Sequence, residues 1–364
     1  MRVHVAMAVA ILLAGGCAHF PGRPLARNVT LGVTHTGGTY NLGNTTQDFL
    51  GQGADAVLDL GSRTIKLWFH RPKDCYPFNS EWPEHFESLI DIAKHPYYRA
   101  VFEKPFKTYI LVAYGPQRPE HYWTKGISDA ECADEQQQFY AFTKYLLSTY
   151  RHTGKTFILQ HWEGDWAIRA SYDPNADPTP AAIEGMVTWL NARQAGVQQA
   201  RQELGEHGVH VYHAAEVNLV ARAMNEGKPN VTNAVLPHTR LDLVSYSSWD
   251  TLSSGPEFRR ALDFIAANMP DSPSFGAKNV YVGEYGFPEN EAPLAKVQEH
   301  IRNVVETGLD WGCPYIVYWE LFCNEARRKP VLKNDDVRGV WLIKPDGSKA
   351  WAWDYLHEKI TESR

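Results

Sequence analysis

Residues 279–288 read Asn-Val-Tyr-Val-Gly-Glu-Tyr-Gly-Phe-Pro, a short apolar run that stops at a glycine and a proline. β-Branched and aromatic residues fill the run almost continuously, which is typical of a strand that is buried on both faces of a parallel sheet. The next run of this kind, residues 315–320, follows a stretch of helical periodicity over residues 292–308. A strand, a helix and a second strand in this order predict one βαβ unit.

The same unit recurs along the chain, so that eight strand-like runs alternate with longer helical patterns. We therefore predict an α/β fold, a single (β/α)8 TIM barrel over residues 28–360, rather than an open doubly wound sheet. The predicted strands are Val29–His35, Thr64–His70, Thr108–Tyr114, Thr156–Trp162, His210–Ala215, Leu241–Ser247, Asn279–Tyr285 and Tyr315–Glu320. The predicted helices are Glu84–Glu103, Ala130–Tyr150, Pro180–Gly205, Pro256–Asn268 and Ala292–Gly308.

The first residues of the chain have the pattern of an export signal. After Met1-Arg2, residues 5–14 form an apolar run, which is too short to cross a bilayer because a spanning helix needs about 20 residues. The run leads into Leu13-Ala14-Gly15-Gly16-Cys17, which resembles a bacterial lipobox. We predict a signal peptide over residues 1–16, a lipid on Cys17 as the mature N-terminus, and a tether over residues 17–27. The expected location is the bacterial cell envelope, with plain secretion as the alternative.

The composition narrows the class of partner. The 364 residues include 36 Lys and Arg against 42 Asp and Glu, so nothing supports binding to nucleic acid through phosphate neutralisation. The 12 tryptophans, 18 tyrosines and 15 phenylalanines suit a core, and also a groove in which sugar rings stack.

Neither the histidines nor the cysteines have metal-ligand spacing, and we predict no metal and no cofactor. An exported chain permits disulfide bonds, whose connectivity stays open. The cysteines concerned are Cys75, Cys132, Cys313 and Cys323.

Two glutamates stand at the carboxyl ends of the fourth and seventh predicted strands. Glu163 lies in Gln160-His161-Trp162-Glu163-Gly164-Asp165-Trp166, and Glu284 lies in the run quoted first. Residues at these strand ends of a (β/α)8 barrel face the active-site mouth. Glycoside hydrolysis with retention needs two carboxyl groups about 5–5.5 Å apart, one to protonate the leaving oxygen and one to attack the anomeric carbon. Either glutamate alone is as readily a salt-bridge partner, and it is their paired placement that indicates catalysis.

With these residues the sequence resembles the retaining glycoside hydrolases of clan A, whose catalytic glutamates lie on strands four and seven. Val280-Tyr281-Val282-Gly283-Glu284-Tyr285-Gly286 resembles their nucleophile strand, and Trp319 matches the strand-eight tryptophan beneath the reacting sugar. The resemblance extends from residue 28 to residue 355, and the family within the clan is not assigned. It implies Glu163 as acid/base and Glu284 as nucleophile. It also implies a hydrogen bond from Tyr246 to Glu284.

One position departs from the clan pattern. Clan members carry an asparagine immediately before the acid/base, where it binds the sugar 2-hydroxyl, whereas this chain has Trp162. We expect either that Gln160 or His161 takes over that contact or that the fourth strand is kinked. The departure leaves Glu216, at the end of the fifth strand, as an alternative acid. Lys66 lies on the second strand, where clan members often place an arginine near the nucleophile, and we interpret it as a structural ion-pair partner.

Several further residues at the strand ends are candidates for contact with a sugar. His35 and His213 are expected either to hydrogen-bond sugar hydroxyls or to be satisfied structural histidines. Asp165 is a further nearby carboxylate, expected to serve as a base or as a sugar ligand. The candidate stacking faces are Trp162, Trp166, Trp249 and Trp319.

The sequence thus predicts a retaining hydrolase of a polysaccharide or oligosaccharide. The alternatives are a non-catalytic carbohydrate-binding lipoprotein on the same barrel and a transglycosylase that remodels envelope glycans. The sugar, the linkage, endo or exo action and the oligomeric state stay open.

Overall fold

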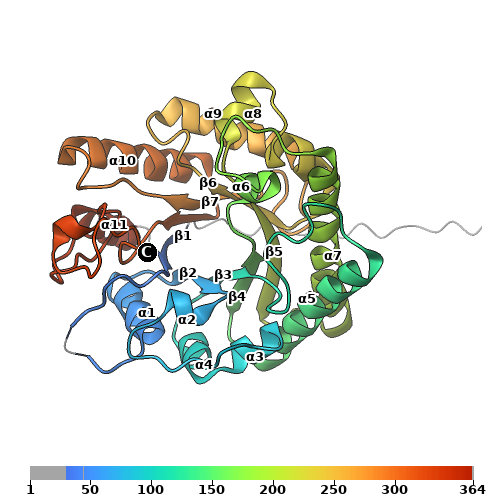
Figure 1. Cartoon of the computed structure of the whole chain (residues 1–364), viewed down its shortest axis with the longest axis horizontal. Helices are drawn as coiled ribbons and strands as arrows, with labels where there is room; N and C mark the ends of the chain where they lie inside the picture. The colour runs from blue at the N-terminus through green and yellow to red at the C-terminus, as the bar shows by residue number, and fades with distance from the viewer. Residues whose placement is uncertain (1–29, 44, 363–364) are drawn as a thin grey trace, which may run out of the picture.

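The computed structural model describes residues 30–43 and 45–362, so that the predicted signal peptide, Cys17 and the tether lie outside the described residues. Eight parallel strands follow one another around a closed barrel, and β1 pairs with β8 (Figure 1). This closure confirms the predicted barrel and excludes the open doubly wound sheet. The strands are β1 Thr30–His35, β2 Thr64–Phe69, β3 Thr108–Ala113, β4 Lys155–Gln160, β5 Val209–Val217, β6 Leu243–Ser247, β7 Val280–Tyr285 and β8 Tyr315–Tyr318.

Helices form the outer layer around the barrel in Figure 1. The longer helices bury apolar stripes on the side that faces the barrel, as α10 does with Val297, Ile301 and Val304 at three- and four-residue spacing. The helices are α1 Phe49–Asp59, α2 Pro72–Cys75, α3 Leu89–Lys94, α4 Pro96–Glu103, α5 Asp129–Thr149, α6 Gly164–Arg169, α7 Pro180–Leu204, α8 Val220–Glu226, α9 Gly255–Asn268, α10 Leu294–Trp311 and α11 Trp351–Glu362.

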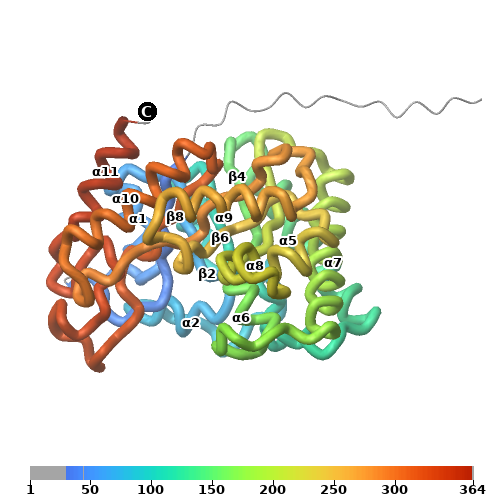
Figure 2. Tube along the Cα trace, turned by 90° about the horizontal axis from the view of Figure 1, so that it is seen from above, coloured from blue at the N-terminus to red at the C-terminus, as the bar shows by residue number. Residues whose placement is uncertain are grey.

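The prediction of one helix over Glu84–Glu103 is wrong, because this segment forms the two helices α3 and α4. Pro96 disfavours a helical conformation in the residue before it, and His95 accordingly adopts φ −57° and ψ 136°. The hydroxyl of Ser88 accepts the backbone N–H of Asp91 and caps α3, so the preceding residues lie outside the helix. Two short helices that were not predicted, α2 and α6, follow β2 and β4 and lie at the same end of the molecule (Figure 2).

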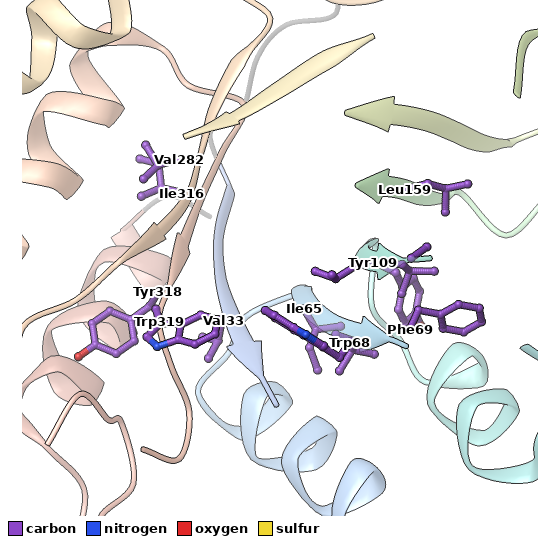
Figure 3. Close-up of a cluster of buried hydrophobic side chains, with 14 of the residues drawn as sticks. Val33, Ile65, Trp68, Phe69, Tyr109, Leu159, Val282, Ile316, Tyr318 and Trp319 are labelled. Carbon is purple, nitrogen blue, oxygen red and sulfur yellow. The ribbon is translucent and has the colours of Figure 1, made fainter. Parts of the chain in front are cut away.

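Side chains alternate along each strand between the barrel interior and the helix layer. A separate apolar cluster fills the interior, and the residues on either side of its members pack outward against the helices. Toward the carboxyl ends of the strands the interior becomes aromatic, and Figure 3 shows Trp68 and Trp319 on either side of β1. The interior cluster consists of Ile110, Ile158, Tyr212, Ala214, Leu243, Tyr281 and Val317.

No disulfide bond joins the four cysteines Cys75, Cys132, Cys313 and Cys323 to one another. Among residues 30–43 and 45–362, no helix combines the length and apolarity that a membrane span requires. The same residues contain no group of three or more His, Cys, Asp and Glu arranged to hold a metal ion.

Candidate active site

A buried lysine joins two glutamates at the mouth of the barrel. The Nζ of Lys66 on β2 lies 2.9 Å from Oε1 of Glu284 and 3.1 Å from Oε2 of Glu216, and the three side chains are at most 2% exposed. Burial alone would lower the pKa of Lys66, but the charges of the two glutamates raise it, so the lysine is cationic. The ion pairs predicted for Lys66 are present, and one of them places this residue directly on the candidate nucleophile.

Glu284 accepts hydrogen bonds at both carboxyl oxygens. Oε1 accepts from Lys66 and from Nε1 of Trp162 at 2.9 Å, and Oε2 accepts from Oγ of Ser247 at 2.9 Å and from Nε1 of Trp249 at 3.4 Å. The pKa of Glu284 is raised by burial and by the charge of Glu216, and the contacts with Lys66 and Ser247 oppose that rise. An ammonium and two indoles can only donate, so three of the four partners stabilise the charged form of Glu284, and only the hydroxyl of Ser247 can accept from a protonated form. The set of partners therefore favours the carboxylate.

A register irregularity directs Glu284 into the barrel. The pairing of β6 with β7 skips Gly283, so that Ser247 lies opposite Glu284. A Cβ atom on Gly283 would lie 1.8 Å from Oγ of Ser245, so no side chain fits at this position. Irregularities of this kind commonly re-aim side chains beside active sites. The Gly-Glu pair at the end of the seventh strand thus has a local structural reason.

Glu163 precedes α6 in a left-handed backbone conformation, with φ 46° and ψ 55°. Its side chain lines a cleft of about 920 Å³ at the carboxyl ends of β2, β3 and β4. Burial, followed by the charges of Glu284 and Glu216, raises the pKa of Glu163 to about 8, although Lys66 acts in the opposite direction. At neutral pH this carboxyl group is therefore protonated, which is the state that a general acid requires.

The cleft opens beside Glu163, whereas Glu284 is 2% exposed and does not line it. One wall is polar: Nε2 of His70 lies 2.9 Å from Oε1 of Glu120, and the sequence analysis singled out neither residue. The other wall carries the predicted stacking residue Trp166, whose ring lies 5.8 Å from the exposed ring of Tyr172.

Three tryptophans close around the ion pair of Lys66 and Glu284. Trp68 lies 5.3 Å from Trp162 and 5.5 Å from Trp319 between ring centroids, and the latter two rings are nearly parallel. Two of the candidate stacking residues, Trp162 and Trp319, therefore meet at the candidate nucleophile, together with Trp68, for which the sequence predicted no role. A ring of indoles around an ion pair limits the access of water and strengthens the electrostatic interactions inside.

The expectation of a hydrogen bond from Tyr246 to Glu284 is wrong. The hydroxyl of Tyr246 donates to Oδ1 of Asp250 at 2.5 Å, and its ring stacks on Phe258 of α9. Tyr246 occupies an outward position of β6, and its neighbour Ser247 points inward and contacts Glu284 instead.

Two of the histidines predicted as sugar ligands also face the helices, and the structure favours the alternative that they are structural. Nε2 of His35 lies 2.8 Å from the carbonyl oxygen of Phe49 on α1, and burial lowers the pKa of His35 to about 4. The ring of His213 packs 5.5 Å from Phe139 of α5. Neither imidazole reaches the cleft.

Both residues expected to replace the missing asparagine contact Glu216. Nε2 of Gln160 donates to Oε2 of Glu216 at 2.9 Å, and Oε1 of Gln160 accepts from the hydroxyl of Tyr281. Nε2 of His161 accepts the backbone N–H of Glu216 at 3.1 Å, and burial lowers the pKa of His161 to about 3, so the ring is neutral. Neither side chain lines the cleft, and the expectation that one of them contacts the sugar is wrong for this geometry.

Two other carboxylates of the strand ends serve the framework. Glu216, the alternative acid, is fully buried and does not line the cleft. Oδ2 of Asp165 accepts the backbone N–H of Asn218 at 2.8 Å, and Oδ1 accepts that of Val231 at 2.8 Å. Asp165 thus fastens the segment after β5 to the start of α6.

Replacing Lys66 by methionine is expected to lower the free energy of unfolding by about 3–5 kcal/mol, because two buried carboxylates lose the cation that they share. Urea denaturation of both proteins measures this difference. The control is Lys144→Met, which removes a solvent-exposed pair with Glu203 and should leave the free energy of unfolding almost unchanged. Equal effects of the two substitutions would contradict a central role of the Lys66 cluster in stability.

The sequence matches no protein-family model and no curated protein. The fold, however, is similar to solved glycoside hydrolases. An exo-β-1,4-mannosidase from Opitutaceae bacterium strain TAV5 has a TM-score of 0.57 at 13% identity, over 92% of this chain and 59% of that one. A GH5_18 protein from Bifidobacterium longum subsp. longum, solved with Manβ1-4GlcNAc, has a TM-score of 0.58 at 12% identity, over 92% and 78% of the two chains. A family 5 lichenase from Caldicellulosiruptor sp. F32, solved with cellotetraose, has a TM-score of 0.52 at 11% identity, over 93% of each.

These likenesses establish a fold rather than an activity. The chain has a barrel similar to the barrels of these glycoside hydrolases, and it spans only 59% of the mannosidase. Proteins that share a fold differ in activity, which depends on the residues of the site.

Proposed function

We propose that this protein is a retaining glycoside hydrolase of an oligosaccharide or polysaccharide, with Glu163 as acid/base and Glu284 as nucleophile. The observation that carries this proposal is the contrast between two carboxyl groups at one barrel mouth. Glu163 lines an open cleft and has a pKa raised to about 8, whereas donors hold Glu284 at both oxygens. When the surroundings keep one carboxyl group protonated and the other ionised, the protonated group can act as the acid and the ionised group as the nucleophile.

The reaction follows from these states in two displacements. In the first, the proton of Glu163 moves to the glycosidic oxygen as the bond from that oxygen to the anomeric carbon breaks, and an oxygen of Glu284 bonds to the same carbon. In the second, Glu163 takes a proton from water, the water oxygen bonds to the anomeric carbon, and the ester bond to Glu284 breaks. Both residues return to their starting states, and two inversions give retention.

The test is the release of products from a broad panel of plant and bacterial polysaccharides. We expect hydrolysis of one glycan class, with the first-formed product in the anomeric configuration of the substrate by proton NMR. A product of inverted configuration would exclude a nucleophilic Glu284, because a single displacement inverts the anomeric carbon.

One observation favours a second function, a carbohydrate-binding protein without turnover. Glu284 is 2% exposed and does not line the cleft, and its Oε1 already accepts a hydrogen bond from the indole of Trp162. Under this alternative a glycan binds beside Trp166 and is not cut. Isothermal titration calorimetry separates the two functions, since binding of equal strength by wild type and Glu284→Gln with no product from either would establish the second.

We also propose that the protein is exported and anchored by a lipid on Cys17, as the sequence pattern around this residue indicates. In a bacterial host, intact-mass spectrometry of the envelope fraction is expected to show a chain that begins at acylated Cys17. Cys17→Ser should abolish the acylated form and leave the uncleaved precursor. A wild-type chain found outside the cells without acylation would contradict the anchor and indicate plain secretion.

A further inference from the structure

Glu216 contacts the candidate site from a position that no step of the proposed reaction uses. It lies near the end of β5, is fully buried, and accepts hydrogen bonds at both oxygens. Oε1 accepts the backbone N–H of Glu163 at 2.9 Å. Oε2 accepts from Nζ of Lys66 at 3.1 Å, Nε2 of Gln160 at 2.9 Å and Oγ of Ser245 at 2.8 Å. A carboxylate that is buried with this many donors is held in one orientation.

The bond from Oε1 acts on the backbone of the candidate acid. Glu163 has φ 46°, in the left-handed region that residues with a Cβ atom rarely adopt. Its N–H donates to Glu216 in this conformation. Such a conformation persists where the surroundings hold it, and here a buried carboxylate on the neighbouring strand does so.

The bond from Oε2 acts on the candidate nucleophile. Lys66 donates to Glu216 and to Glu284, so the orientation of one carboxylate fixes the cation that binds the other. The backbone of Glu216 is fixed in turn, because its N–H donates to the neutral ring of His161. A chain of short contacts therefore runs from Glu163 through Glu216 and Lys66 to Glu284.

We propose that Glu216 is a positioning residue that couples the two candidate catalytic carboxyl groups, fixing the backbone of Glu163 directly and the side chain of Glu284 through Lys66. The inference rests on the proposed function for the roles of Glu163 and Glu284, while the coupling itself rests on the contacts. It replaces the interpretation of Glu216 as an alternative acid.

The charges of the cluster give the coupling a measurable consequence. Two carboxylates and one ammonium leave a net charge of −1 beside Glu163, which favours a proton on that residue. Two other titratable groups that face the cluster are neutral, because burial lowers the pKa of His161, just after β4, and raises the pKa of Tyr281 on β7 well above its usual range. The guanidinium of Arg193 on α7 acts on His161 and stays charged in every variant. Removing the charge of Glu216 therefore removes a cause of the raised pKa of Glu163.

The experiment is Glu216→Gln, which keeps the shape of the side chain and removes its charge. The titration of the Glu163 carboxyl carbon is followed by ¹³C NMR in glutamate-labelled protein and assigned with Glu163→Gln. We expect the midpoint of Glu163 to fall by about one pH unit. The matched control is Asp242→Asn, because Asp242 is also a buried carboxylate, paired with Arg201 at 2.9 Å at the start of β6, and this variant should leave the midpoint unchanged.

Two further variants keep the test decisive. Glu216→Asp retains the charge and should keep the midpoint near that of wild type. If Glu216→Gln does not fold, Lys66→Met takes its place and is expected to raise the midpoint of Glu163. An unchanged midpoint in a folded Glu216→Gln, or a lowered one in Lys66→Met, would overturn the coupling. The titration needs no substrate, so its outcome does not depend on activity. A wild type that cuts no glycan would contradict the proposed function but not the coupling.

Discussion

Glu284→Gln is expected to lower kcat on the responsive glycan by about 10⁴-fold or more, the scale on which enzymes lose activity when a nucleophile is removed. The amide has no charge to direct at the anomeric carbon, and its nitrogen does not form the ester that the second displacement needs. The carboxamide oxygen can still accept from Lys66 or Trp162, so the barrel should remain folded. Product release measures the rate, and urea denaturation measures the fold.

The control for this variant is Glu299→Gln, the same chemical change on the exposed face of α10, which should leave both quantities at the wild-type level. A Glu284→Gln protein that is folded and retains more than a few per cent of the wild-type kcat would remove Glu284 from the reaction. In that case the contacts that Lys66 and Ser247 make with Glu284 would have only a structural role.

The alternation of apolar runs was enough to predict the barrel and the strand ends at which both glutamates lie. Strand ends can be predicted because a buried run stops at residues such as Gly286 or Glu163. Which side chains of a strand point into the barrel could not be predicted. In a strand covered on both faces, apolar residues point both inward and outward, so apolarity alone does not tell the two sets of positions apart. Tyr246 was therefore expected at the contact that its neighbour Ser247 makes, whereas His213 takes the structural one of its two predicted roles.

The sequence predicted an ion pair for Lys66 but not the two carboxylates that it binds, because these come from distant parts of the chain. Lys66 is 218 positions from Glu284 and 150 from Glu216, and only the closure of the barrel brings the three together. One local signal was nevertheless present. Lys66 lies in the apolar run Thr64-Ile65-Lys66-Leu67-Trp68, and a lysine within a buried strand requires an acidic partner in the interior. That signal predicts an ion pair without naming its partner.

Glu163→Gln is expected to lower turnover by about 10²- to 10⁴-fold on glycans, whose leaving alkoxide needs a proton. On aryl glycosides of the same sugar with an acidic phenol, the loss in the first step should be much smaller, because the phenolate leaves without protonation. In wild type, kcat/KM should fall as the pH rises through about 8, because Glu163 donates only while protonated and its pKa is raised to about that value. This limb of the profile should be absent in the variant.

The aryl glycoside also separates the two roles of Glu163. The first displacement proceeds in Glu163→Gln, but the second is slow because no base takes the proton of water, so phenol should appear in a burst. Intact-mass spectrometry should then show the chain with one added glycosyl unit on Glu284. Glu284→Gln should show neither burst nor added mass, since it cannot form the ester.

If Glu216→Gln rather than Glu163→Gln gives the dependence on the leaving group, the acid is Glu216. Its complete burial and its four donors argue against that outcome, because an acid must have a proton and a path to the leaving oxygen.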